Sequence, residues 1–430
     1  MKTILKNATL LPEYGFGDRL VHVTVKNRKI TGISEELPAS AHADEVIDCA
    51  GDLLMPAFCN AHCHAAMTLF RGYGEDLPLQ DWLEKKIFPA EEKLTFRSVY
   101  HASMLAIAEM LRNGIASFSD MYMFEDAVAE AVLATGIKAN LSRSLVSFDP
   151  EVDMGKEART VEAIRLAEWY QGSDDNRLLI DFSLHAEYTN VPKACEYVAT
   201  LAERLHTGMQ IHLSETRREQ EECLARWGKT PAEFFRDTGV FEVPTTAAHC
   251  VWVTDSDIAI LREKGVTVAH NPVSNLKLGS GVAPVRKLLD AGVNVALGTD
   301  GAASNNRLDI LRELQTAALI HKGVTNNPTE LRAAELVPMA TENGMRAQGR
   351  RDCGRVEPGY RADLILIDRN GLHNLPDYDD YAMLAFSAQA TDVKMTMVDG
   401  RILFRNGEYT SIDEERLRFD CRETFAHYFD

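Results

Sequence analysis

The 430-residue sequence has no apolar run near the ~18 residues that a membrane-spanning helix needs. Its first residues lack the apolar core and small-residue cleavage site of a secretory signal peptide. The eight cysteines are scattered and form no Cys-x-x-Cys pair, so we expect buried reduced thiols rather than a disulfide framework. These absences predict a cytoplasmic protein with no membrane partner.

Positive charge is also scarce. The chain carries 64 acidic and 46 basic residues, which gives a formal net charge of −18. Nucleic-acid binding needs a basic face that neutralises phosphates, so the charge argues against nucleic acid as the main partner. The Gly-x-Gly-x-x-Gly turn of dinucleotide-binding sheets is absent too, which weighs against a doubly wound open sheet.

The chain does contain a β-rich segment at each end and alternating strands and helices between them. We expect residues 1–55 and 360–430 to pair into one small β-sandwich domain. The α/β pattern of residues 56–359 predicts a (β/α)8 TIM barrel that forms the catalytic domain. The expected strands are 53–64, 115–123, 137–146, 178–188, 208–215, 245–253, 266–275 and 293–301.

Histidines gather at the C-terminal ends of these strands, where barrel enzymes hold their active sites. His62 and His64 flank Cys63 on the first strand. Successive side chains of a strand point to opposite faces, so the two histidines share one face and Cys63 packs on the other. His212 and Asp300 end two other strands. Three imidazoles and a carboxylate suit zinc, iron(II) or another divalent ion, which lowers the pKa of bound water toward ~7.

Three residues of the same region suit proton transfer. Glu215 lies three residues past His212, where it can reach a substrate without binding the metal. Asp300 can bind the metal and accept the proton of the water, and His249 can hydrogen-bond the attacking hydroxide. His270 is expected to brace the loop "HNPVSN" instead of binding metal.

The motifs "PAFCNAHCHAAMTLFRG", "IHLSET", "AAHCVWV", "HNPVSNLKLGSGVAPV" and "LGTDGAASNN" resemble the amidohydrolase superfamily. "HAAMTLFRGYGEDLPLQDWLEKKIFPAEEKL" is similar to its 5'-methylthioadenosine/S-adenosylhomocysteine deaminase branch. The resemblance covers residues 50 to 310 and continues more loosely into "EPGYRADLILID". It implies a homo-oligomer with one zinc ion per subunit, held by His62, His64, His212 and Asp300.

The resemblance also implies the reaction, the hydrolytic deamination of adenine nucleosides to an inosine-type product and ammonia. The candidate substrates are 5'-methylthioadenosine, S-adenosylhomocysteine and adenosine. Metal hydroxide attacks C6, Glu215 moves a proton at the ring, and His249 positions the hydroxide. The remaining substrate contacts that it implies are Glu91 to the ribose hydroxyls, Arg143 to the 5' substituent, His185 to the sugar and Ser304 to the ring edge.

Two departures from the family pattern concern the 5' end of the substrate. Glu187 stands where a proline is typical, and we expect its carboxylate near the mouth to repel a substrate carboxylate. The segment "SFDPEVDMGKEAR" has no clear counterpart of a second arginine, for which Lys156 and Arg159 are possible substitutes. Two alternatives stay open, namely an aminohydrolase or chlorohydrolase of another heterocycle (a triazine or guanine) and a catalytically silent assembly protein.

Overall fold

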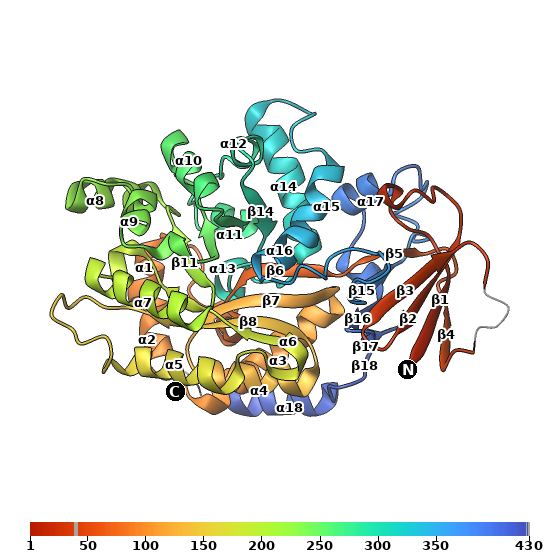
Figure 1. The fold of residues 1–430 in the computed structure, drawn as a ribbon, viewed down its shortest axis with the longest axis horizontal. Coiled ribbons are helices and arrows are strands. Elements are labelled where there is room, and N and C mark those ends of the chain that lie inside the picture. Colours follow the sequence, from red (N-terminus) through yellow and green to blue (C-terminus); the bar gives the residue numbers. More distant parts are fainter. Residues whose placement is uncertain (38–41, 427, 429–430) are drawn as a thin grey trace.

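The middle of the chain forms a ring of parallel strands in the computed structural model, which describes residues 1–37, 42–426 and 428 (Figure 1). The ring consists of β6 (Phe58–Cys63), β7 (Ile115–Tyr122), β8 (Lys138–Leu145), β10 (Phe182–Leu184), β11 (Met209–Leu213), β12 (Thr245–His249), β13 (Thr267–His270) and β14 (Asn294–Leu297), with β9 (Leu178–Ile180) also paired to β8. The backbone N–H of Asp300, just past β14, donates to the carbonyl oxygen of His62 at 3.0 Å and links the last strand to the first. The predicted (β/α)8 barrel is confirmed.

Helices surround the ring, and those before residue 348 follow its strands in sequence, whereas the last two follow strands of the terminal segment (Figure 1). They are α1 (Leu79–Trp82), α2 (Phe88–Glu91), α3 (Phe96–Arg112), α4 (Glu125–Thr135), α5 (Ala158–Tyr170), α6 (Ser173–Asn176), α7 (Pro192–Leu205), α8 (Arg217–Trp227), α9 (Pro231–Asp237), α10 (Asp255–Glu263), α11 (Pro272–Lys277), α12 (Val285–Asp290), α13 (Ala302–Asn305), α14 (Ile310–Thr325), α15 (Ala333–Ala340), α16 (Glu342–Ala347), α17 (Asp380–Phe386) and α18 (Glu414–Phe425). The strand expected over 266–275 ends at His270, because Pro272 cannot donate to a strand ladder and instead begins α11.

The two chain ends form two further sheets. One has the order β3–β2–β1–β4, and the other β18–β17–β16–β15–β5. Their strands are β1 (Lys2–Ala8), β2 (Val21–Lys26), β3 (Lys29–Ser34), β4 (Glu45–Asp48), β5 (Leu53–Pro56), β15 (Leu364–Ile367), β16 (Val393–Val398), β17 (Arg401–Arg405) and β18 (Glu408–Tyr409). Apolar side chains of both sheets, among them Val23 and Met397, share one buried cluster, so the sheets pack as a sandwich. The strand expected over 53–64 therefore divides, since β5 pairs with β15 in this sandwich and β6 enters the barrel.

The last helix, α18, lies outside the terminal sheets, although the sequence placed residues 360–430 in one β domain. It packs along α3 of the barrel (Figure 1). Thr424 Oγ1 lies 2.6 Å from His101 Nδ1, and Cys421 Sγ donates to the carbonyl oxygen of His101 at 3.5 Å. The chain end thus returns to the catalytic barrel.

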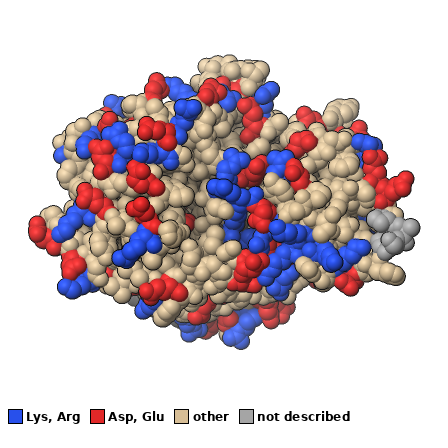
Figure 2. Space-filling model, viewed as in Figure 1, with Lys and Arg blue, Asp and Glu red and all other residues tan. Residues whose placement is uncertain are grey.

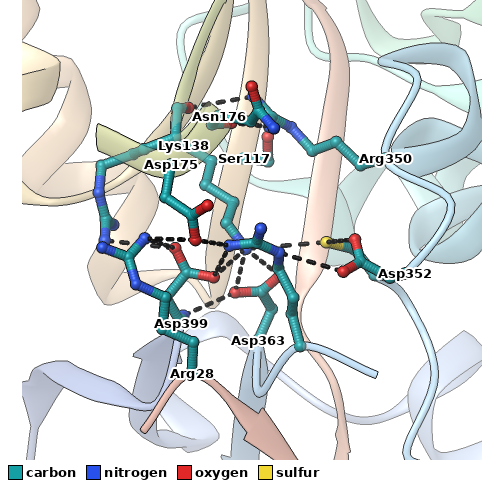
Figure 3. A network of polar contacts seen from close by, with 12 residues as sticks. Arg28, Ser117, Lys138, Asp175, Asn176, Arg350, Asp352, Asp363 and Asp399 are labelled. Atoms are coloured by element: carbon teal, nitrogen blue, oxygen red, sulfur yellow. Dashed lines mark hydrogen bonds and ion pairs between the residues drawn. The ribbon is translucent and has the colours of Figure 1, made fainter. Parts of the chain in front are cut away.

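A buried ionic network joins the barrel to the terminal sheets (Figure 3). Lys138, the first residue of β8, places its Nζ 2.5 Å from Asp363 and 2.8 Å from Asp399. All three side chains are buried, and Arg177 and Arg361 also contact Asp399. Because Arg143 lies near the C-terminal end of the same strand, the network and the predicted active site occupy opposite ends of β8.

The surface and the thiols agree with the composition. On the face shown in Figure 2, acidic and basic side chains are interspersed, and basic ones gather along the boundary between barrel and terminal sheets. All eight cysteines are buried and free, as predicted. Within the described residues, no helix combines the length and the apolar character needed to cross a membrane.

Candidate active site

Four predicted metal ligands meet at the C-terminal end of the barrel. Asp300 Oδ1 lies 3.2 Å from His64 Nε2 and 3.6 Å from His62 Nε2, and His212 Nε2 lies 3.4 Å from His64 Nε2. The ring centroids of His62 and His212 are 4.9 Å apart. Cys63 is buried and does not line the cavity. The structure therefore brings together donors from the first, fifth and last strands of the barrel.

Backbone carbonyl groups orient two of these imidazoles. His64 Nδ1 lies 2.6 Å from the carbonyl oxygen of Met121, and His212 Nδ1 lies 2.7 Å from that of His185. A carbonyl oxygen only accepts, so each Nδ1 carries the proton and donates it. In the neutral form of each ring, the Nε2 atom is then unprotonated and faces the centre of the group, as metal ligation requires.

The donor set fits a divalent cation. His62 Nε2 is buried without a hydrogen-bond partner, which is costly unless a ligand occupies the site. Burial lowers the pKa of His62 to about 4 and that of His212 well below its usual range, so both imidazoles are neutral. Burial alone would raise the pKa of Asp300, but His62 and His64 lower it well below its usual range. Neutral imidazoles and an ionised carboxylate are the protonation states that bind metal.

Asp300 is held by its own surroundings. Its Oδ2 accepts hydrogen bonds from Ser274 Oγ at 2.6 Å and Ser304 Oγ at 2.9 Å, and its Oδ1 accepts one from the Gly301 N–H at 2.8 Å. The φ of Asp300 is 60°, a left-handed conformation that is unfavourable for a residue with a Cβ. Ser304, expected at the ring edge of a substrate, thus lines the cavity while it donates to Asp300.

Glu215 and His249 lie beside the four candidate metal ligands. His249 Nε2 is 3.8 Å from Glu215 Oε2, and its Nδ1 lies 2.8 Å from Asn275 Oδ1. Glu215 Oε1 accepts a hydrogen bond from Ser280 Oγ at 3.1 Å. Burial raises the pKa of Glu215, which favours the protonated carboxyl.

His270 lies outside this group, because its Nε2 is 3.3 Å from His321 Nε2 of α14 and its side chain does not line the cavity.

Three of the four candidate ligands line one cavity of about 580 Å³ together with Glu215 and His249. His62 is buried and is not part of the cavity wall. Glu91 lies in its wall and accepts a hydrogen bond from Tyr122 OH at 2.7 Å. Burial raises the pKa of Glu91 to about 7, although the Tyr122 hydroxyl acts in the opposite direction. His185 lines the cavity next to His212, with ring centroids 4.9 Å apart.

Two arginines line the same cavity. Arg143 Nε forms an ion pair with Glu162 Oε2 at 2.7 Å, and its Nη1 donates to the Ser144 carbonyl oxygen at 2.8 Å. Arg159 lines the cavity near Phe148 and donates to the carbonyl oxygen of Val146 at 2.9 Å. Lys156, the other proposed substitute, pairs with Asp153 and does not line the cavity.

The expectation that Glu187 stands at the mouth is wrong. Its side chain is fully buried outside the cavity, and its Oε1 pairs with Arg226 Nη2 of α8 at 2.5 Å. Strand alternation would place it on the same face as His185, but β10 ends at Leu184 and Glu187 begins a 3-10 turn. Glu187 therefore presents no charge to a substrate.

Two polar contacts of the site were missed in the sequence. Tyr122 ends β7, so the rule that found the histidines at strand ends would also have found it. Ser274 was assigned to a strand but lies in α11, which turns its hydroxyl toward Asp300.

Known proteins share this architecture. Residues 53–403 match the family model described as "Amidohydrolase family". A 5-methylthioadenosine/S-adenosylhomocysteine deaminase from Moorella thermoacetica is 43% identical over 420 residues, 97% of this chain and 97% of the relative. A 5'-deoxyadenosine deaminase from Methanosarcina acetivorans is 43% identical over 426 residues, 97% of this chain and 96% of the relative. The crystal structure of an adenosine deaminase from Xanthomonas campestris with bound zinc has a TM-score of 0.92 at 32% identity, covering 99% of this chain and 98% of that chain.

Proposed function

The chain belongs to the amidohydrolase family, and we propose that it is a zinc-dependent hydrolytic deaminase of adenine nucleosides. The observation that carries this proposal is one cavity whose wall combines three of the four candidate ligands, the acid Glu215 and the Tyr122-bound carboxylate of Glu91. The fourth, His62, is buried with its Nε2 3.6 Å from Asp300 Oδ1. The candidate substrates are 5'-methylthioadenosine, S-adenosylhomocysteine, 5'-deoxyadenosine and adenosine, each converted to the inosine-type product and ammonia.

His62, His64, His212 and Asp300 would hold one zinc ion. Its Lewis acidity lowers the pKa of a coordinated water, which becomes a nucleophile at neutral pH. The relative with bound zinc supports this choice of metal.

The other residues bind the nucleoside and move protons. Glu91 accepts hydrogen bonds from the ribose hydroxyls, and His185 contacts the sugar. Glu215 donates a proton to N1 of the ring, while Asp300 takes one proton from the attacking water. His249 donates through Nδ1 to Asn275, so its Nε2 accepts from that water and orients it. The amino group takes the proton from Asp300 and leaves as ammonia, and the second water proton restores Glu215.

Arg143 and Arg159 face the 5' end of the nucleoside in this arrangement. Phe148 and Val146 add apolar surface there. These contacts suit a methylthio or other neutral 5' group, and Arg143 offers a cation to a substrate carboxylate only in competition with Glu162.

Glu91 separates this proposal from the hydrolysis of a triazine or guanine. A bare heterocycle has no sugar hydroxyls that could donate hydrogen bonds to the Tyr122-bound carboxylate of Glu91. A silent assembly protein would not need to keep the complete donor set together with Glu215. Neither alternative is favoured by a specific contact.

The experiment is a deamination assay on the zinc-loaded protein. Adenosine, 5'-methylthioadenosine, S-adenosylhomocysteine, 5'-deoxyadenosine and guanine are supplied separately, and ammonia release is followed together with the loss of adenine absorbance. We expect turnover of adenosines and none of guanine. Protein that binds zinc but releases no ammonia from any adenosine would refute the proposal.

A further inference from the structure

The chain end reaches the wall of the nucleoside cavity. After α18 has packed along α3, Tyr428 inserts its side chain beside α2, the helix that ends in Glu91. The Tyr428 hydroxyl donates to the carbonyl oxygen of Ala90 at 2.8 Å. Its ring lies against Phe70, with centroids 5.7 Å apart and planes at 61°.

Tyr428 therefore touches two segments that carry cavity residues. Ala90 immediately precedes Glu91, and Phe70 ends the 3-10 segment that follows the ligand His64. Tyr428 is only 9% exposed. Burial, and then the charge of Glu91, raises the pKa of its hydroxyl, which stays protonated and donates.

The helix that carries Glu91 needs such support. α2 has four residues and continues from α1 through a π-helical segment, Leu83–Ile87, so the helix is irregular just before Glu91. Segments of this kind are held by tertiary contacts because their own hydrogen bonds are few. Tyr122 fixes the carboxylate of Glu91, and Tyr428 fixes the peptide group just before it.

We propose that Tyr428 is a positioning residue for Glu91, so that the C-terminal segment sets the affinity of the site for the sugar of the nucleoside. This inference rests on the proposed function, in which Glu91 accepts the ribose hydroxyls. Tyr428 acts through the Ala90 carbonyl and touches neither the substrate nor the metal ligands.

The test compares adenosine with 2',3'-dideoxyadenosine, which lacks both hydroxyls that Glu91 would accept. Tyr428→Phe removes the hydrogen bond and keeps the ring against Phe70. We expect the KM of adenosine to rise about 3- to 10-fold, the effect of one hydrogen bond, with kcat retained and the KM of dideoxyadenosine unchanged. Tyr428→Ala should raise the KM of adenosine further.

Tyr409→Phe is the matched control. The hydroxyl of Tyr409, in β18, also donates to a helix carbonyl oxygen, that of Ala108 in α3, at 2.9 Å. This variant should leave both KM values unchanged. In a Glu91→Gln background, Tyr428→Phe should add no further loss, since the group it positions is already impaired.

Equal KM increases for the two substrates, a loss of thermal stability alone, or full additivity with Glu91→Gln would overturn the inference. An unchanged KM of adenosine in Tyr428→Phe would also overturn the inference. If the wild-type protein still deaminates adenosine, the proposed function stands in each of these cases. Failure of the wild-type protein to deaminate adenosine would refute the proposed function and this inference with it.

Discussion

Asp300 meets His62 twice: its backbone N–H donates to the His62 carbonyl oxygen at 3.0 Å, and its Oδ1 lies 3.6 Å from His62 Nε2. The contact that joins the ends of the barrel thus also sets the spacing between candidate metal ligands of the first and last strands. The main-chain bond does not depend on the side chain, so the two roles are separable by mutation.

Asp300→Asn should abolish zinc binding and activity while the thermal transition of the metal-free protein stays close to that of the metal-free wild type. The amide is neutral and binds metal poorly, whereas the main-chain bond is kept. Metal analysis and calorimetry of both chelator-treated proteins provide the measurement. Zinc content equal to wild type would exclude Asp300 as a ligand.

Glu215→Gln should lower kcat by about 10²- to 10⁴-fold, because the amide cannot donate and recover a proton at the ring. Zinc content should be unchanged, since Glu215 is outside the ligand set. The control is Glu221→Gln, because Glu221 is an exposed glutamate of α8, the helix that follows Glu215. Comparable kcat in both variants would remove Glu215 from the mechanism.

Affinity for ribose should depend on pH. The pKa of Glu91 is raised to about 7, so the carboxylate that accepts hydroxyl protons forms as pH rises through that value. The KM of adenosine relative to dideoxyadenosine should therefore fall between about pH 6 and 8. Tyr122→Phe removes the hydrogen bond that lowers this pKa and should move the profile to higher pH. A profile that moves to lower pH would contradict the assignment.

Glu162→Gln should favour a carboxylate-bearing substrate. Glu162 occupies Arg143 Nε at 2.7 Å and competes with a substrate carboxylate for it. We expect kcat/KM for S-adenosylhomocysteine to rise about two- to fivefold relative to 5'-methylthioadenosine, the scale of an exposed ion pair. Glu168→Gln on the exposed surface of α5 is the control, and an identical ratio in both variants would show that Arg143 does not face the 5' end.

Lys138→Met should destabilise the fold by about 3–5 kcal/mol, because it removes the lysine that pairs with the buried carboxylate of Asp363, whereas Asp399 keeps Arg177 and Arg361 (Figure 3). Urea denaturation measures the change. Lys156→Met removes an exposed lysine paired with Asp153 and should leave the midpoint unchanged. A midpoint for Lys138→Met equal to wild type would mean that the network contributes no stability.

The grouping of the four candidate metal ligands was predictable because the signal is local. Residues two apart on a strand point to the same face, and the C-terminal ends of the parallel strands meet at one end of the barrel. These two rules allowed the sequence alone to group His62, His64, His212 and Asp300. Glu215 and His249 followed from the same rule. Family resemblance then indicated Glu91 and Arg143, which strand alternation alone does not reach.

The positions of Glu187, Tyr428 and Glu162 could not be predicted, because they depend on backbone turns and on contacts between residues distant in sequence. Glu187 follows a strand by three residues, and only the 3-10 turn there directs it to Arg226. Tyr428 and Ala90 are separated by 338 residues, and no periodicity connects them. Glu162 meets Arg143 because α5 packs against β8, a tertiary contact that no single-residue pattern specifies.

The ionic network also has a consequence for biosynthesis. Lys138 and Asp363 are separated by 225 residues, a stretch that a ribosome delivers in about 11 to 45 s. During that interval, β8 carries an amino group that the finished protein buries, and its two carboxylate partners do not yet exist. A nascent barrel therefore cannot reach its final form strand by strand as it emerges. Its completion waits for the arrival of residues 363 and 399.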